Sequence, residues 1–330
     1  MDHAYADIHR LIADLLAAGQ PFAVVTVLHS TGSAPRRAGA KAIVQANGTL
    51  QGTVGGGILE ARAMEVAMEC LKTGGARVFE FRFGGSDPGE NLPVCGGKMV
   101  LLVDAEPVQS LAAYAAAAGA MRQRRGGTLV TRFLDGRAEV RWIEGRAEMP
   151  GGEYTLVEHL VPPPRLVIAG GGHVGQALAR CAATAGFELV IVEDRPEFAR
   201  AELFPESADI RLGDFARTLR ELPLDGQTFI AIVTRGHRTD AAALEACIGR
   251  PAAYIGMMGS RRKVALLRET MLAAGKTTEA QWATVHAPIG LDIGAETPEE
   301  IAVSIVAQLI TARRSGADAL VGTSTRADEG

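Results

Sequence analysis

The chain has 330 residues, of which 47% are hydrophobic and 22% are charged, and its formal net charge is −4. This composition is typical of a globular protein of about two domains and excludes a largely disordered chain. The small net charge gives no reason to expect nucleic acid or a membrane surface as a partner, and no apolar run reaches the roughly 18 residues of a spanning helix.

The first residues and the cysteines favour a reducing compartment. The opening MDHAYADIHR lacks the basic and then apolar pattern of a secretory signal, so we expect a cytoplasmic protein. Cys70, Cys95, Cys181 and Cys247 are far apart and form no CxxC pair. Neither disulfides nor a structural zinc site are therefore expected.

The first half of the chain combines short strands with amphipathic helices. Apolar side chains at helix spacing predict a helix over 8–16, and three glycines open a second helix over 58–71. Asn47-Gly48 is a strong hairpin signal. The predicted strands are 22–28, 41–45, 49–54, 77–83 and 98–104.

The second half alternates strands and helices. Its predicted strands are 166–169, 189–192, 210–212, 228–234, 252–255 and 284–286. Its helices are expected to begin near Val174, Thr239, Ser260 and Pro298. Short apolar strands alternating with helices predict a parallel sheet covered on both faces, so the fold class is α/β with a Rossmann-like doubly wound sheet in this half.

Composition also suggests where the parts of the chain divide. Three consecutive prolines, at 162–164, cannot join a helix or a central strand. We therefore predict an N-terminal α/β domain, then a helix, a hairpin and a proline-rich linker, then the Rossmann-like domain, and finally a mobile tail. The predicted bounds are 1–106, 107–164, 165–313 and 314–330.

The glycine-rich segment 170–175, GGGHVG, carries the clearest ligand signal. It follows a strand and opens a helix, where free N–H groups and the helix dipole favour an anion. Gly170 suits a tight turn, Gly172 allows a phosphate to approach the backbone, and Gly175 allows close helix–strand packing. The alternative is that these glycines serve packing alone.

Acidic and imidazole side chains lie at the same predicted strand ends. Glu193 or Asp194, about 20 residues after the glycines, is placed to accept from ribose hydroxyls. His173 and His237 stand among glycines, where a loop or ligand contact is favoured over a metal role because no HxxxH or HxH spacing supplies further ligands.

Two further segments are candidate anion sites. Ser260 and Arg261 begin a helix whose first turn is basic, which suits either a bound phosphate or a solvated surface. In the first half, Arg36, Arg37 and Lys41 follow a strand, and a helix entrance at Gly55, Gly56 and Gly57 adds backbone amides. As a charge run alone, this loop would simply be solvated.

Cys95 differs from the other cysteines. Cys70, Cys181 and Cys247 fall in predicted helices among apolar residues, whereas Cys95 stands in PVCGG. Two adjacent glycines leave its sulfur uncovered, and a thiolate suits a soft metal or the carriage of sulfur.

Taken together, these segments resemble the XdhC/CoxI family of accessory proteins for xanthine dehydrogenase and related molybdenum hydroxylases. The similar stretches include VTVLHSTGSAPRRAGAKAIV, GTVGGGILE, PVCGGKMVLLV, LVIAGGGHVGQALA, TRGHRTD and YIGMMGSRRK. They cover nearly the whole chain apart from residues 107–160 and the tail.

The resemblance implies a cofactor chaperone. Such a protein would bind molybdenum cofactor, support its sulfuration and insert it into an apo hydroxylase, with a cysteine desulfurase as a second partner and a homodimer as its assembly. The family's VCGG cysteine corresponds to Cys95, and its fingerprint glycines to Gly170, Gly172 and Gly175. If cofactor binding also uses Cys95, molybdenum would be its metal.

The residues alone leave two other functions open. The glycine fingerprint with Glu193 and Asp194 suits an NAD(P)-dependent oxidoreductase, although no Tyr-x-x-x-Lys pair accompanies it. A regulatory module that senses a nucleotide in the Rossmann crevice is the third hypothesis. On balance the sequence favours a cofactor-binding maturation factor over an enzyme.

Overall fold

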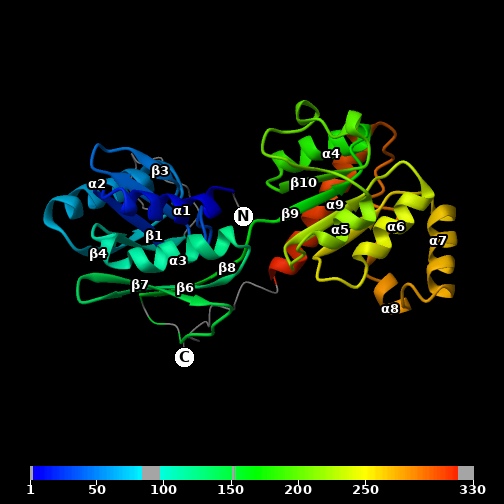
Figure 1. The fold of residues 1–330 in the computed structure, drawn as a ribbon. Coiled ribbons are helices and arrows are strands. Elements are labelled where there is room, and N and C mark those ends of the chain that lie inside the picture. The colour runs from blue at the N-terminus through cyan, green and yellow to red at the C-terminus, as the bar shows by residue number, and fades with distance from the viewer. Residues whose placement is uncertain (1–2, 84–96, 151, 153, 319–330) are drawn as a thin grey trace. The chain divides into compact units, whose positions relative to one another are not determined.

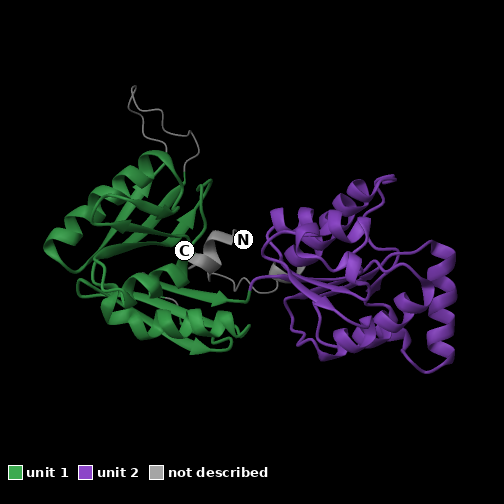
Figure 2. Cartoon of the chain, turned by 45° about the horizontal axis from the view of Figure 1, so that its top comes forward, with its two compact units in different colours: residues 1–162, 323–330 green, residues 163–322 purple. Residues whose placement is uncertain are grey.

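The computed structural model describes residues 3–83, 97–150, 152 and 154–318. The chain divides between Pro162 and Pro163 into two compact units, which are coloured separately in Figure 2. None of the helices in these residues combines the length and apolarity that crossing a membrane requires.

The N-terminal unit is built on two antiparallel sheets (Figure 1). The larger sheet has the strand order β3-β2-β1-β5-β4, and the smaller has the order β7-β6-β8. The elements in chain order are α1 (His3–Ala17), β1 (Phe22–Thr31), β2 (Lys41–Gln45), β3 (Leu50–Gly52), α2 (Gly57–Thr73), β4 (Ala76–Arg82), β5 (Lys98–Asp104), a 3-10 turn (Pro107–Ser110), α3 (Leu111–Arg122), β6 (Gly127–Leu134), β7 (Arg137–Glu144) and β8 (Thr155–Leu160).

Both faces of β1 are covered. Ala23 and Val25 belong to a core shared with α2, whereas Phe22 and Val24 belong to one shared with α1 and α3. A strand buried on both faces shows an unbroken apolar run instead of alternation, which explains why its sequence predicted it clearly.

β8 lies within the range predicted as a linker. It pairs antiparallel with β6, where Leu129 faces Glu158 and Thr131 faces Leu156. The signal was weak because a charged residue, Glu158, occupies a buried position of the strand. The chain up to Pro162 therefore packs as one unit.

The C-terminal unit has one parallel sheet of six strands, which confirms the predicted fold class. Its order, β11-β10-β9-β12-β13-β14, is the 3-2-1-4-5-6 order of doubly wound dinucleotide-binding folds. The elements are β9 (Arg165–Ala169), α4 (His173–Thr184), β10 (Glu188–Glu193), two 3-10 turns (Pro196–Phe198 and Ala201–Leu203), β11 (Asp209–Leu212), α5 (Phe215–Glu221), β12 (Thr228–Ile232), α6 (His237–Cys247), β13 (Tyr254–Met257), α7 (Arg261–Ala273), α8 (Glu279–Trp282), β14 (Val285–His286) and α9 (Pro298–Asp318).

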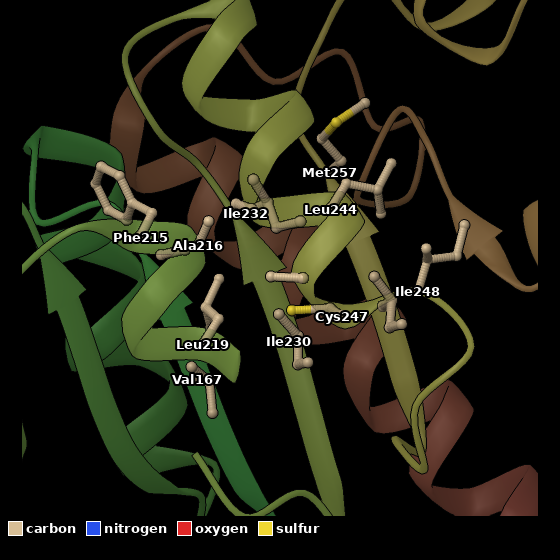
Figure 3. Packing of buried hydrophobic residues seen from close by; sticks show 14 of the residues in the cluster. Val167, Phe215, Ala216, Leu219, Ile230, Ile232, Leu244, Cys247, Ile248 and Met257 are labelled. Atoms are coloured by element: carbon tan, nitrogen blue, oxygen red, sulfur yellow. The ribbon is translucent and has the colours of Figure 1, made fainter. Parts of the chain in front are cut away.

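The helices cover the two faces of this sheet. Leu166 and Ile168 of β9 pack with α4 and α9, whereas Val167 packs with α5, α6 and α7. Figure 3 shows side chains of α5 and α6, among them Leu219 and Cys247, over the strands. The loops that follow the strands lie at the carboxyl edge of the sheet, which is where ligands bind in this fold.

The structure extends the prediction at three places. α5 and α8 were not predicted, and α9 runs to Asp318, beyond the expected start of the tail at 314. Residues 319–330 lie outside the described part of the chain.

Candidate ligand-binding cleft

The three fingerprint glycines have separate structural roles. Gly170 has a φ of 120°, and a Cβ there would lie 2.5 Å from the carbonyl oxygen of Val233. A Cβ on Gly175 would collide with the Gly170 carbonyl, so this glycine permits the close approach of α4 to β9. A Cβ on Gly172 would meet no atom within 4 Å. Gly172 therefore borders open space, as a phosphate site requires.

The amino end of α4 borders a cleft of about 280 Å³ at the carboxyl edge of the sheet. Gly172 is the N-cap residue of this helix, and no side chain caps it. Free amides at a helix amino end attract anions. Other residues lining the cleft include His173, Arg195, Thr234, Arg235 and Met258.

The buried side chain of Glu193 holds the glycine loop through hydrogen bonds. Its carboxylate is 1% exposed and accepts hydrogen bonds from the backbone N–H of Gly171 at 2.6 Å and of Arg195 at 3.1 Å. It also accepts from the N–H of Asp194 and from Nε of Arg195. Glu193 thus holds the loop and also lines the cleft, and its contact with a ribose stays a prediction.

The pKa values of Glu193 and Asp194 are shifted in opposite directions. Burial raises the pKa of Glu193, but hydrogen bonds from Arg195 and the Gly171 N–H outweigh this effect and lower the pKa below its usual range. Burial and the neighbouring Glu193 raise the pKa of Asp194. Among the described residues, Asp194 Oδ1 has no hydrogen-bond partner. This oxygen is buried and lies 3.7 Å from Nε of Arg195, and Asp194 is not among the residues that line the cleft.

Two arginines line the cleft, and each lies near a carboxylate of the protein. The guanidinium of Arg195 lies 3.9 Å from the ring centre of Phe198 and donates to Glu193, so its position is fixed. Arg235, which is more exposed, lies 3.6 Å from Asp194. The cleft therefore offers helix amides and guanidinium groups together, which is a donor set for phosphate.

His173 is the first residue of α4 and lines the cleft. His237 begins α6 and is exposed. Within the described residues, no three His, Cys, Asp or Glu side chains are grouped as a metal site would need.

Ser260 and Arg261 lie outside the cleft lining. The Ser260 side chain accepts from the N–H of Lys263 at 3.3 Å, so it caps α7 as predicted. Arg261 is 89% exposed and lies 3.8 Å from Asp292. From this loop, Met258 is the residue that reaches the cleft.

One buried network near the cleft escaped the sequence analysis. Asp240 is 1% exposed, accepts from Oγ1 of Thr234 at 2.5 Å and pairs with Nζ of Lys263 at 2.6 Å. It joins the cleft residue Thr234 to the first turns of α6 and α7. The acidic residue three places after His237 in TRGHRTD was the available signal, because Asp in a first turn often bonds locally.

Arg36, Arg37 and Lys41 do not form one cluster of cations, because the Lys41 side chain is buried. The Lys41 ammonium is fully buried and pairs with Glu158 of β8 at 2.5 Å. Arg36 is half-buried and Arg37 is exposed in the loop after β1. This pairing favours a structural role for Lys41, and its part in binding a cofactor anion stays a prediction.

The glycine turn before α2 lies against that basic loop. A Cβ on Gly55 would be 2.7 Å from Cγ of Pro35, whereas Cβ atoms on Gly56 and Gly57 would meet no atom within 4 Å. The Glu60 carboxylate accepts from the Val54 N–H at 3.3 Å. An acidic side chain of the protein therefore already binds an amide at this helix entrance. Cys95, the remaining candidate of this half, lies outside the described residues.

The described geometry, an antiparallel α/β unit followed by a doubly wound unit with a cleft at its glycine loop, defines a two-domain protein of the Rossmann class. Comparison with known proteins identifies the family. Residues 166–309 match the XdhC Rossmann domain, and residues 15–82 match the XdhC and CoxI family. The chain belongs to the XdhC and CoxI family, as its motifs predicted.

Three relatives illustrate the range of the family. YqeB of Escherichia coli K12, an uncharacterised protein, is 28% identical over 91% of this chain. A probable xanthine dehydrogenase component from Bacillus subtilis is 30% identical over 48% of it. The molybdenum cofactor insertion chaperone PaoD of E. coli K12 is 26% identical over 93% of it. The chain spans 45%, 46% and 88% of these relatives, respectively.

A solved structure shares the fold. The crystal structure described as a xanthine dehydrogenase from Bacillus halodurans superposes with a TM-score of 0.78 at 24% identity. The match covers 97% of this chain and 98% of that one, so the arrangement of elements is common to both.

Proposed function

We propose that this chain is a maturation factor that binds molybdenum cofactor and delivers it to an apo molybdenum hydroxylase of the xanthine dehydrogenase type. The observation that carries the proposal is the uncapped amino end of α4, which borders the cleft beside two arginines. The similarity to PaoD, a molybdenum cofactor insertion chaperone, extends over both units and supports the same role.

The cleft suits the phosphate end of this cofactor. Molybdenum cofactor is a pterin with a phosphate and a dithiolene-bound metal, and the metal supplies redox chemistry once it is in the client enzyme. The amides at Gly172 and His173 would hold the phosphate, and Arg195 and Arg235 would balance its charge. At about 280 Å³ the cleft is slightly smaller than sites that enclose a drug-sized ligand, so it suits one end of the molecule.

An exchange at Gly172 tests this site. Gly172→Asp places bulk and negative charge in the cleft, and Gly226→Asp is the matched control because a Cβ there also meets no atom within 4 Å. We expect the wild type and the control to retain molybdenum and pterin on purification with the cofactor, and Gly172→Asp to lose them. Mass spectrometry measures both. Equal retention by all three proteins would remove the cleft from the proposal.

Sulfuration of the cofactor, with a cysteine desulfurase as partner, is the finer part of the proposal. It rests on Cys95, whose thiolate suits a soft metal or sulfur transfer. Cys95→Ala should preserve the thermal midpoint but lower molybdenum retention, whereas Cys181→Ala in α4 should preserve both. Unchanged molybdenum content in Cys95→Ala would exclude the cysteine from cofactor binding. We also propose a homodimer, which sedimentation velocity tests.

An NAD(P)-dependent oxidoreductase or a nucleotide sensor is the second candidate function, and the Rossmann strand order favours it. Binding of NAD is disfavoured, because Glu193 at the end of β10 already accepts four hydrogen bonds from the protein. Calorimetric titration with NAD and NADP separates the hypotheses. Micromolar binding with turnover supports an enzyme, and nucleotide-dependent binding of a partner supports a sensor.

A further inference from the structure

The first turns of α6 and α7 form a positively charged surface. His237 and Arg238 begin α6, and Arg261 and Arg262 begin α7. The two helix ends are neighbours, because Asp240 in the first turn of α6 pairs with Lys263 in the first turn of α7 at 2.6 Å. Exposed arginines therefore begin both of two neighbouring helices.

These charges are poorly compensated within the chain. Among the described residues, Arg238 and Arg262 have no ion pair, and both are exposed. Arg261 is 3.8 Å from Asp292, but the two side chains are 89% and 90% exposed, where ion pairs contribute little. Cations at a helix amino end also oppose the helix dipole. An external negative charge would relieve both effects.

Apolar side chains lie beside the cations. Leu291 and Ile293, in the loop after β14, are 42% and 53% exposed. The neighbouring Asp292 is the partner of Arg261, which places this loop next to the start of α7. We name His237, Arg238, Arg261, Arg262, Leu291 and Ile293 together the docking face.

The apolar loop is held in place by α9. The Ser304 hydroxyl donates to the Leu291 carbonyl at 2.5 Å, and the Gly290 N–H donates to Gln308 Oε1 at 2.7 Å. Gly290 itself has a φ of 99°, which suits glycine. These hydrogen bonds hold the backbone at Gly290 and Leu291, two residues before Ile293.

We propose that the docking face binds an acidic protein surface with an apolar centre, and that this surface belongs to the client hydroxylase. The proposal rests on the function proposed above. Arginine and apolar side chains together are typical of protein interfaces. Nucleic acid is disfavoured, because the chain has a net charge of −4 and a phosphate backbone would leave the exposed leucine and isoleucine without an apolar partner.

The docking face adjoins the cleft through two loops. Thr234 and Arg235 line the cleft and lead into Arg238, and Met258 lines it and leads into Arg261. A partner bound to the docking face would therefore lie next to the cleft. This position suits direct transfer of a ligand from the cleft to the partner.

Charge reversal tests the docking face. Arg238→Glu/Arg262→Glu is compared with Arg180→Glu, an exposed arginine in the carboxyl-terminal half of α4. The probe is the apo xanthine dehydrogenase-type hydroxylase of the same organism, immobilised for surface plasmon resonance. We expect the double variant to associate roughly tenfold or more slowly at low salt, with a weaker salt dependence, and the control to match the wild type. Ile293→Ser should raise the dissociation rate.

Several outcomes would overturn the docking face. One is equal association of the double variant and the wild type with the hydroxylase, and another is no association of the wild type. A third is an effect of the variants on self-association, or on binding of a labelled DNA duplex, instead of on binding of the hydroxylase. Thermal melting confirms that each variant is folded. Cofactor retention by the wild type is measured separately, so a protein that binds the hydroxylase but no cofactor refutes the proposed function and leaves the docking face supported.

Discussion

Two glycines of the segment 170–175 differ in their tolerance for a side chain. Gly172 has a φ of −68° and open space around its missing Cβ, whereas a Cβ on Gly175 would collide with the Gly170 carbonyl. We expect Gly175→Ala to lower the free energy of unfolding by about 1–3 kcal/mol, the usual cost of overpacking. Gly172→Ala should cost less and reduce anion binding. Urea denaturation checks the order, and similar losses for both would contradict it.

Asp104, at the end of β5, makes the stability of the N-terminal unit depend on pH. Burial raises its pKa from 3.8 to about 6. The folded state then holds the proton more tightly than the unfolded chain, so stability falls as pH rises from about 4 to about 6 and stays reduced above that.

Asp104→Asn should therefore stabilise the protein near neutral pH. Asparagine keeps an acceptor for the Glu106 N–H, which donates to Asp104 Oδ1 at 3.0 Å. We expect a gain of at most about 3 kcal/mol at pH 7.5 and a smaller gain near pH 4.5, since one pKa unit corresponds to about 1.4 kcal/mol. Denaturant titrations at both pH values measure it. A gain that does not change with pH would refute the assignment.

At the scale of elements, the buried Lys41–Glu158 pair joins β2 of the larger sheet to β8 of the smaller one. Removing one partner leaves a buried charge, so Lys41→Met should destabilise the protein by about 3–5 kcal/mol. Lys98→Met, in the exposed pair with Glu80, should cost less than about 1 kcal/mol.

The double variant Lys41→Met/Glu158→Met separates structure from ligand binding. It should recover most of the stability, because apolar residues often replace a buried ion pair without loss. Retention of molybdenum cofactor by this variant would agree with a structural role for Lys41. Loss of the cofactor from a stable double variant would return Lys41 to the binding site.

The long apolar runs and the glycine turns made most elements predictable from the sequence. β1 and β9 are covered on both faces, so their sequences are unambiguous. The helices that were missed are short. α5 has seven residues and is capped by Asp214, and α8 has four residues with a capping box between Thr278 and Gln281. Their caps were visible in the sequence, but their length gave no apolar period.

At the scale of the whole molecule, the site was less predictable than the fold. The glycine loop follows from local sequence, whereas Glu158 reaches Lys41 across 117 residues and Glu193 reaches Gly171 across 22. Such pairings depend on which strands become neighbours in the sheets. A sequence shows the charge of each residue, but it does not show which charges the protein neutralises itself.

The division between Pro162 and Pro163 predicts two independently folding parts. Each unit has its own buried apolar clusters, and the clusters of one unit share no residues with those of the other. Fragments 1–162 and 163–318, expressed separately, should each melt cooperatively and keep the helical content expected for that part. Circular dichroism measures this. A fragment that remains unfolded alone would show that the units depend on each other.

The hydrogen bonds of Glu193 to the glycine loop affect how the cleft binds its ligand. Because the carboxylate is bonded to the Gly171 amide and to the start of the following segment, folding itself sets the shape of the loop. A ligand then meets a preorganised surface and loses little of its binding free energy to ordering the backbone. Glu193→Gln should therefore weaken affinity through a looser loop, even though the exchange removes a negative charge from the neighbourhood of a bound anion.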